Sequence, residues 1–189
     1  MNNLVIIAHP DEHSFCYNGI FKTICSTLTH HNENVDVIDL YKDKFNVFGD
    51  DEKTILYREM ITRSNRIYII SPVWWFRCTP LLESFFDQVL SPGFAYKFIP
   101  VTKSLGIPKP FLKDKKVRTY LTHGAPALPV LTLYVNSVKL RLVMGVFSFV
   151  FGWFRTRTRQ FWYVPFVSDG KRKKYLQKVV KDVEKDIHG

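Results

Sequence analysis

Three consecutive aromatic residues, Trp74, Trp75 and Phe76, follow an apolar run that ends in Pro72. The run over residues 66–71 is typical of a buried strand, and the pattern becomes helical a few residues after the aromatics. Large aromatic side chains are costly to leave in water. The carboxyl end of a parallel strand is also where ligands bind in an open α/β sheet. The pattern therefore predicts a site for a flat, conjugated ligand such as a flavin ring, although these tryptophans could instead belong to the core or to a subunit interface.

A second candidate segment, A-H-P-D-E-H-S-F-C-Y-N-G over residues 8–19, joins the first predicted strand to a helix. The free N–H groups and the positive dipole at the start of a helix suit a phosphate. Ser14 offers a hydroxyl and His9 an imidazole as further donors, although Ser14 could simply cap the helix. Neither a Walker loop nor the G-x-G-x-x-G fingerprint is present. Asp11 and Glu12 would repel a phosphate and are expected to face solvent, and His13 is interpreted as a solvent-side loop residue.

A third loop, L-T-H-G-A-P over residues 121–126, follows the fourth predicted strand. His123 in this loop could relay a proton, because histidine titrates near neutral pH. It could equally serve as a structural hydrogen-bonding group, and the residues leave both possibilities open. There is no His/Cys cluster with metal-ligand spacing, and no metal is expected.

The chain has 189 residues, a net charge of +10 and three cysteines. The length suits one domain over residues 1–189. An odd number of cysteines without metal spacing fits a reducing, cytoplasmic setting, and no signal peptide is expected. The charge favours anionic partners without identifying one. Basic residues gather in 113–116, at Arg155, Arg157 and Arg159, and in 171–174, and each cluster is interpreted first as solvated surface. Nucleic-acid binding is not expected, because no recognisable module accompanies the charge.

Strands and helices are predicted to alternate along the chain, which indicates a doubly wound α/β sheet of five strands. The predicted strands are residues 4–8, 35–40, 66–71, 117–122 and 160–167. The predicted helices are residues 18–29, 50–64, 79–90, 131–151 and 169–187, with Asp50 or Asp51 as the N-cap of the second.

Two segments need separate interpretation. Residues 97–116 are rich in Pro and Lys, and such a long connection is expected to be functional or mobile. The helix predicted over residues 131–151 is apolar nearly all round, which indicates burial. Its uninterrupted apolar run, residues 142–151, is too short to span a bilayer. We expect it to contribute to the core and to bury a face against a second subunit, with a peripheral membrane contact as the alternative.

The three loops together resemble those of the flavodoxin-like NAD(P)H:quinone oxidoreductases, a group that includes modulator-of-drug-activity and potassium-efflux ancillary proteins. The first loop resembles the family's H-P-x-x-x-S-F-N motif, with Cys16 in place of asparagine. The third resembles the family's T-T-G-G loop, with His123 and Ala125 as departures, so the chain is more similar to a divergent subgroup. The matching residues are His9, Pro10, Ser14, Phe15, Pro72, Trp74, Trp75, Phe76, Pro80, the G-F-A-Y of residues 93–96, Thr122 and Gly124.

The resemblance implies a flavodoxin-like, five-stranded parallel sheet of order 2-1-3-4-5 with helices on both faces. It implies a flavin, FMN or FAD, that takes a hydride at N5 from NADPH or NADH and passes it to a quinone or similar acceptor in a ping-pong reaction. It also implies a homodimer, and as an alternative a regulatory subunit of a potassium-efflux transporter at the membrane. The implied flavin-binding residues are His9, Ser14, Phe15, Cys16, Pro72, Val73, Trp74, Trp75, Phe76, Thr122, His123 and Gly124, with His123 as the catalytic candidate.

Overall fold

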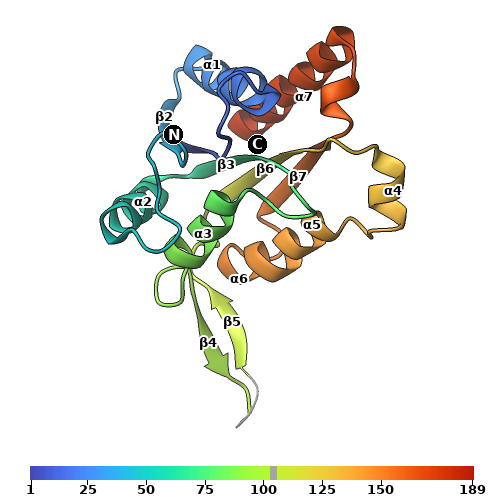
Figure 1. Ribbon diagram of the computed structural model, residues 1–189. Coiled ribbons are helices and arrows are strands. Elements are labelled where there is room, and N and C mark those ends of the chain that lie inside the picture. Colours follow the sequence, from blue (N-terminus) through green and yellow to red (C-terminus); the bar gives the residue numbers. More distant parts are fainter. Residues whose placement is uncertain (103–105) are drawn as a thin grey trace.

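Five parallel strands form the central sheet in the order β2-β1-β3-β6-β7 (Figure 1). The computed structural model describes residues 1–102 and 106–189. The predicted topology is confirmed, with β6 and β7 as the fourth and fifth strands of the sheet. The strands are β1 (Asn2–Ile7), β2 (Asn34–Asp39), β3 (Arg66–Pro72), β6 (Lys116–Thr122) and β7 (Thr156–Phe161).

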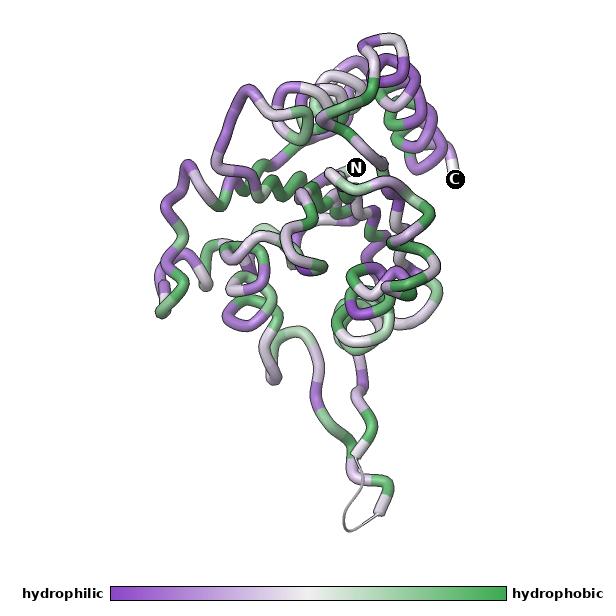
Figure 2. The backbone as a smooth tube through the Cα atoms, turned by 45° about the vertical axis from the view of Figure 1, so that its right-hand side comes forward, coloured by the Kyte–Doolittle hydropathy of each residue, from purple (hydrophilic) through white to green (hydrophobic). Residues whose placement is uncertain are grey.

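Helices cover both faces of the sheet (Figure 1). One face packs against η1 (Phe15–Phe21), α1 (Lys22–His30) and α7 (Asp169–His188). The other packs against α2 (Asp51–Arg63), α3 (Pro80–Val89) and the segments η2 (Arg141–Phe147) and α6 (Ser148–Val150). Each face has its own hydrophobic cluster. Figure 2 shows the apolar central strands with helices of mixed hydropathy around them.

The apolar runs that predicted the central strands are explained by their position. β1 and β3 each lie between two other strands, and helices pack against both of their faces. Residues 4–8 and 67–70 are almost completely buried. Strands buried on both faces are apolar throughout rather than alternating, as parallel sheets require.

Helix starts follow the capping signals in the sequence. The Asp50 carboxylate accepts a hydrogen bond from the Lys53 amide at 3.2 Å, which confirms Asp50 as the N-cap of α2. Ser168 caps α7 in the same way, and Pro80 occupies the first turn of α3, where a missing N–H costs nothing.

The prediction of one long irregular connection over residues 97–116 is wrong for much of that segment. β4 (Tyr96–Pro100) and β5 (Gly106–Pro110) pair as an antiparallel hairpin that projects from the body of the protein (Figure 1). The prolines of this segment argued against strands, because proline cannot donate to a ladder. A two-stranded sheet has an open edge on each strand, and proline is tolerated there. Residues 103–105 of the predicted loop lie outside the described residues.

The prediction of a single apolar helix over residues 131–151 is also wrong. The segment is divided into α4 (Ala127–Thr132), α5 (Ser137–Leu140), η2 and α6, and it is interrupted at Val135 and Asn136, whose φ angles are +51° and +49°. Asparagine tolerates this left-handed conformation, but valine rarely adopts it. The apolar sequence therefore gave no sign of the break. Within the described residues, no helix has both the length and the apolar character needed to cross a membrane.

The last strand was predicted four residues too late, over residues 160–167. β7 ends at Phe161, and the chain then turns through Tyr163, at φ +56°, into the short helix η3 (Val164–Phe166). The alternating arginines of β7 obscured the strand. Arg159 is accommodated because its guanidinium forms an ion pair with Asp182 of α7, so a charged residue lies where an apolar one was expected.

Candidate functional site

The predicted loops meet at the carboxyl ends of β1, β3 and β6. The chain leaves β1 toward β2 on one side and later returns to β3 on the other, so the switch point of the sheet lies between β1 and β3. A cavity of about 780 Å³ opens there. It is lined by His9, His13, Ser14, Phe15, Cys16, Asn18, Gly19, Pro72, Val73, Trp74, Thr122, His123, Gly124, Val164, Pro165, Asp169, Arg172, Lys173 and Leu176.

Ten of the twelve predicted binding residues line this cavity, and Trp75 and Phe76 do not. The Trp75 side chain is 91% exposed. The Phe76 ring instead packs on Tyr134, with 4.2 Å between ring centroids. Both residues have positive φ angles, +49° and +59°, which turn their side chains out of the regular strand direction. Of the three aromatics, only Trp74 contributes to the cavity wall.

The first loop leads into a helix whose leading amides have no partner. Ser14 accepts a hydrogen bond from the Tyr17 amide at 3.2 Å, so its oxygen caps the helix while its hydroxyl hydrogen stays available as a donor. The amides of Phe15 and Cys16 make no hydrogen bond within the described residues. Since η1 continues directly into α1, these amides lie at the positive end of a long helical segment. The arrangement suits a phosphate group.

The imidazole of His9 lines the same cavity and is held in one tautomer. Its Nδ1 accepts a hydrogen bond from the Asp11 amide at 3.0 Å, which leaves Nε2–H as the donor. Burial lowers the pKa of His9, although the nearby Asp11 carboxylate opposes the shift. Asp11 and Glu12 are exposed, as predicted, and Glu12 forms an ion pair with Lys42 at 3.1 Å. His13 is also exposed, but it lines the cavity rather than facing solvent alone.

Cys16 joins the first loop to the third. Its thiol shares a hydrogen bond of 3.1 Å with the Thr122 hydroxyl, and both residues are buried. Burial raises the pKa of Cys16 to about 12, more than the Thr122 hydrogen bond lowers it. The thiol is therefore protonated at neutral pH and contributes no negative charge to a site that would hold a phosphate.

Two of the four backbone amides of residues 73–76 are paired within the protein. The Val73 amide donates to the Thr122 carbonyl at 2.8 Å, and the Trp74 amide donates to the Arg77 carbonyl at 2.9 Å. The amides of Trp75 and Phe76 make no hydrogen bond with any described residue. Of the four amides of this loop, those of Trp75 and Phe76 are therefore the ones free to donate a hydrogen bond to a ligand.

The third loop fixes His123 in the cavity wall. Its amide donates to the Phe161 carbonyl and its carbonyl accepts from the Val164 amide, at 2.8 and 2.9 Å. The imidazole stacks on Trp162, with 4.1 Å between ring centroids. Only 3% of the residue is exposed, and its Nε2 has no hydrogen-bond partner. Burial lowers the pKa of His123 to about 4, so the ring is neutral at pH 7.

Two cations at the cavity rim were not predicted as site residues. Arg172 and Lys173 come from the first turns of α7, and the Arg172 guanidinium donates to the carbonyls of Val164 and Pro165 at 3.4 and 3.2 Å. The Arg172 Nε is buried without a partner. The sequence showed the basic run 171–174, but only the packing of α7 beside η1 brings two of its members to the loops.

The chain is similar to known proteins in sequence and in fold. An uncharacterized NAD(P)H oxidoreductase of Haemophilus influenzae is 28% identical over 79% of this chain and 78% of its own length. An FMN-dependent NADH:quinone oxidoreductase of Mycoplasma mobile is 28% identical over 63% of this chain and 56% of its own. The solved NAD(P)H:quinone oxidoreductase from Methanothermobacter marburgensis has a TM-score of 0.78 at 18% identity and covers 100% and 98% of the two chains.

The family model described as the flavodoxin-like fold matches residues 1–185. That range includes all three loops of the cavity and every strand of the sheet. The chain therefore belongs to the flavodoxin-like fold family.

Proposed function

We propose that the protein is a flavin-dependent NAD(P)H oxidoreductase that reduces a quinone or a similar small acceptor. The observation that supports this most strongly is the cavity at the switch point, which is lined by Trp74, by a neutral, buried imidazole and by the residues that carry the unpaired helix-start amides. The relatives described above are named for the same class of reaction.

The residues present fit a flavin, and FMN is the form we favour over FAD. The cavity has the size of a typical small-ligand site. The amides of Phe15 and Cys16, with the hydroxyl of Ser14 and Nε2–H of His9, would hold the flavin phosphate. Val73, Trp74 and Gly124 would bound the ring. Apart from its chain neighbours, no atom of the described residues lies within 4 Å of a Cβ built on Gly124, so a planar group can approach the backbone there. When bound, a flavin supplies the hydride acceptor and donor chemistry.

The protein's own residues would orient the reactants and set the local charge. The free amides of Trp75 and Phe76 lie in the turn beyond Trp74, outside the cavity lining. They would donate to the polar edge of a ring that extends past Trp74 and would stabilise negative charge there. His123 would act as a fixed hydrogen-bonding group at Nε2. A pKa of about 4 makes it a poor proton carrier at neutral pH, which favours the structural role over the relay.

Arg172 and Lys173 would bind the phosphates of the nicotinamide cosubstrate. Cations at this end favour NADPH over NADH, because NADPH carries an additional phosphate. We infer NADPH as the preferred electron donor.

Steady-state kinetics on the FMN-loaded protein test the proposal. Parallel double-reciprocal lines for NADPH and a quinone are expected, since the two substrates would use one site in turn. Replacing both rim cations, Arg172→Ala with Lys173→Ala, should raise the KM for NADPH about tenfold or more with a smaller effect on kcat. Lys174→Ala, on the same helix but outside the cavity, is the control. An FMN-loaded protein that does not oxidise NADPH would contradict the enzyme and favour the regulatory alternative.

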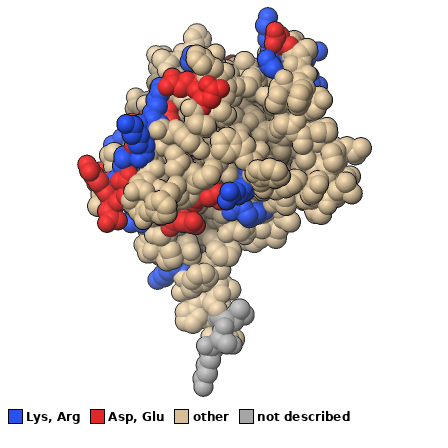
Figure 3. Space-filling view, in the orientation of Figure 1, with Lys and Arg blue, Asp and Glu red and all other residues tan. Residues whose placement is uncertain are grey.

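We further infer a homodimer. Exposed apolar side chains cover α4 and the turn that follows it, namely Leu128, Leu131, Leu133, Tyr134 and Val135. Figure 3 shows this side of the molecule without charged residues. A contiguous apolar surface of this kind is typical of a protein contact, and a second copy of the chain is the occupant that the family resemblance implies.

A further inference from the structure

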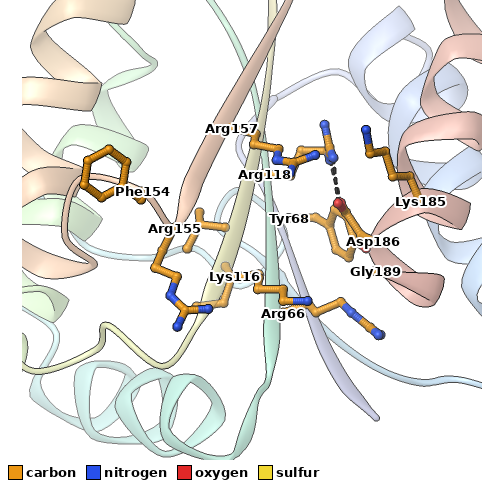
Figure 4. Close-up of a pocket in the computed structure, with 12 residues that line it drawn as sticks. Arg66, Tyr68, Lys116, Arg118, Phe154, Arg155, Arg157, Lys185, Asp186 and Gly189 are labelled. Carbon is orange, nitrogen blue, oxygen red and sulfur yellow. Dashed lines mark hydrogen bonds and ion pairs between the residues drawn. The ribbon is translucent and has the colours of Figure 1, made fainter.

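A second cavity, of about 240 Å³, lies at the opposite end of the sheet, where β3 and β6 begin (Figure 4). It shares no lining residue with the cavity at the switch point. Six of its lining residues are basic and one is acidic: Arg66, Lys116, Arg118, Arg155, Arg157 and Lys185 against Asp186.

The strand register brings these cations together. Arg66 pairs with Lys116 across β3 and β6, and Arg118 pairs with Arg157 across β6 and β7. Because strand side chains alternate with a period of two, Lys116 and Arg118 project from the same face of the sheet. Like charges on directly opposed strand positions destabilise a sheet. The fold therefore bears an electrostatic cost at this end.

Two of the cations are already neutralised. Arg118 forms a bidentate ion pair with Asp186 of α7, in which its Nε and Nη2 donate to the two carboxylate oxygens at 2.5 and 2.6 Å. Arg66 forms an ion pair with Glu33 at 3.1 Å and donates to the Ile187 carbonyl at the end of α7. Both are nearly completely buried. These contacts fix the side chains of Arg66 and Arg118 in the lining of the cavity.

The other four cations have no carboxylate partner among the described residues. Lys116, Arg155, Arg157 and Lys185 are all exposed at the mouth of the cavity. Two buried groups of the lining, the Tyr68 hydroxyl and the Arg66 Nε, also have no hydrogen-bond partner. A buried donor without a partner costs about 1–3 kcal/mol. An anion in the cavity would reduce the repulsion between the cations and would accept hydrogen bonds from the two unpaired donors.

We propose that this cavity binds a phosphorylated anion through Arg157, Lys185, Arg155 and Lys116. A phosphoryl group offers several acceptor oxygens and the divalent charge that clustered arginines bind best. The volume suits one or two phosphoryl groups rather than a dinucleotide. Phe154, which is 98% exposed, adds an apolar wall at the rim for the remainder of the ligand. Such a ligand could be a free phosphorylated metabolite or the headgroup of an anionic lipid, which have this chemistry in common.

Calorimetric titration of the full chain with inorganic pyrophosphate, and sedimentation with phosphatidic acid vesicles, test the proposal. The test variant replaces Arg157 and Lys185 by Glu. The control replaces Lys174 and Lys178, two exposed lysines of α7 outside both cavities, by Glu, so that the change in net charge is the same. FMN binding, measured in parallel, reports on the other cavity and should be unchanged in both variants.

We expect the test variant to lose at least about tenfold in affinity and the control to lose less than about threefold. Binding of pyrophosphate without binding of vesicles would identify a free anion as the ligand, and vesicle binding alone would identify a lipid headgroup. Absence of both, or an equal loss in the test and control variants, would overturn the proposal.

Discussion

The imidazole of His123 shows how burial sets chemistry at the scale of one residue. Its pKa lies near 4 instead of 6.5, so between these values the unfolded chain binds more protons than the folded one. The free energy of unfolding should therefore fall as the pH drops through this range, while above it His123 has no effect.

Between pH 7 and pH 5 the loss of unfolding free energy from this one residue should be about 2 kcal/mol. His123→Gln keeps a hydrogen-bonding side chain but cannot titrate, so it should lose correspondingly less. Urea unfolding of both proteins at the two pH values gives the loss of unfolding free energy in each. The difference between the two losses reports on His123, because any contribution from His9 is common to both proteins. An NMR titration that places the pKa of His123 near 6.5 would show that the ring is not held in the neutral state.

At the scale of elements, the start of η1 depends on a glycine. A Cβ on Gly19 would lie 2.9 Å from the ring of Phe15, which lines the cavity. The Phe15 ring also packs on Phe161 and Tyr175, so it has little room to move.

Gly19→Ala should therefore displace Phe15, with a cost of about 1–3 kcal/mol in unfolding free energy and weaker FMN binding. Gly145→Ala, in η2, is the matched control, because the nearest atom there lies at 3.8 Å. Chemical unfolding and FMN titration measure both effects. Equal stability and affinity in the two variants would mean that Phe15 does not shape the cavity.

The sequence could predict an element where the residue pattern itself shows which positions are buried or capped. β1 and β3 are covered on both faces, so their apolar runs are unambiguous, and α2 shows its cap at Asp50. The start of β7 could not be predicted, because Arg159 is accommodated in the strand by an ion pair with Asp182 of α7, which lies far away in the sequence. The break at Val135 requires a conformation that local preference opposes, so only tertiary packing could reveal it.

The same distinction applies to the site. His9, Trp74 and Thr122 could be predicted because they lie at or just after the ends of strands, and these ends must share one edge of the sheet. Arg172 and Lys173 could not, because α7 begins far away in the sequence and its approach depends on helix packing. Trp75 and Phe76 were assigned to the ligand, yet a left-handed backbone turns them away from the cavity. Residue type alone does not specify that turn.

At the scale of the whole molecule, the apolar surface over α4 predicts self-association. Light scattering should give twice the chain mass of 22.2 kDa. Leu131→Lys with Leu133→Lys should shift the protein to monomers, because a stable interface cannot bury unpaired charges. Ile55→Lys, at an exposed apolar position of α2, should leave the mass unchanged. Monomeric wild-type protein, or a dimer that survives the double substitution, would contradict the homodimer.

We propose that the cavity at the switch point holds a flavin that exchanges electrons with NADPH. The most direct test is the visible spectrum of the freshly purified protein, with any released chromophore identified by its mass. We expect the absorption bands of a flavin, identified as FMN, that bleach when NADPH is added and return when a quinone is added. A colourless protein that takes up neither FMN nor FAD would contradict the claim, although the fold would stand.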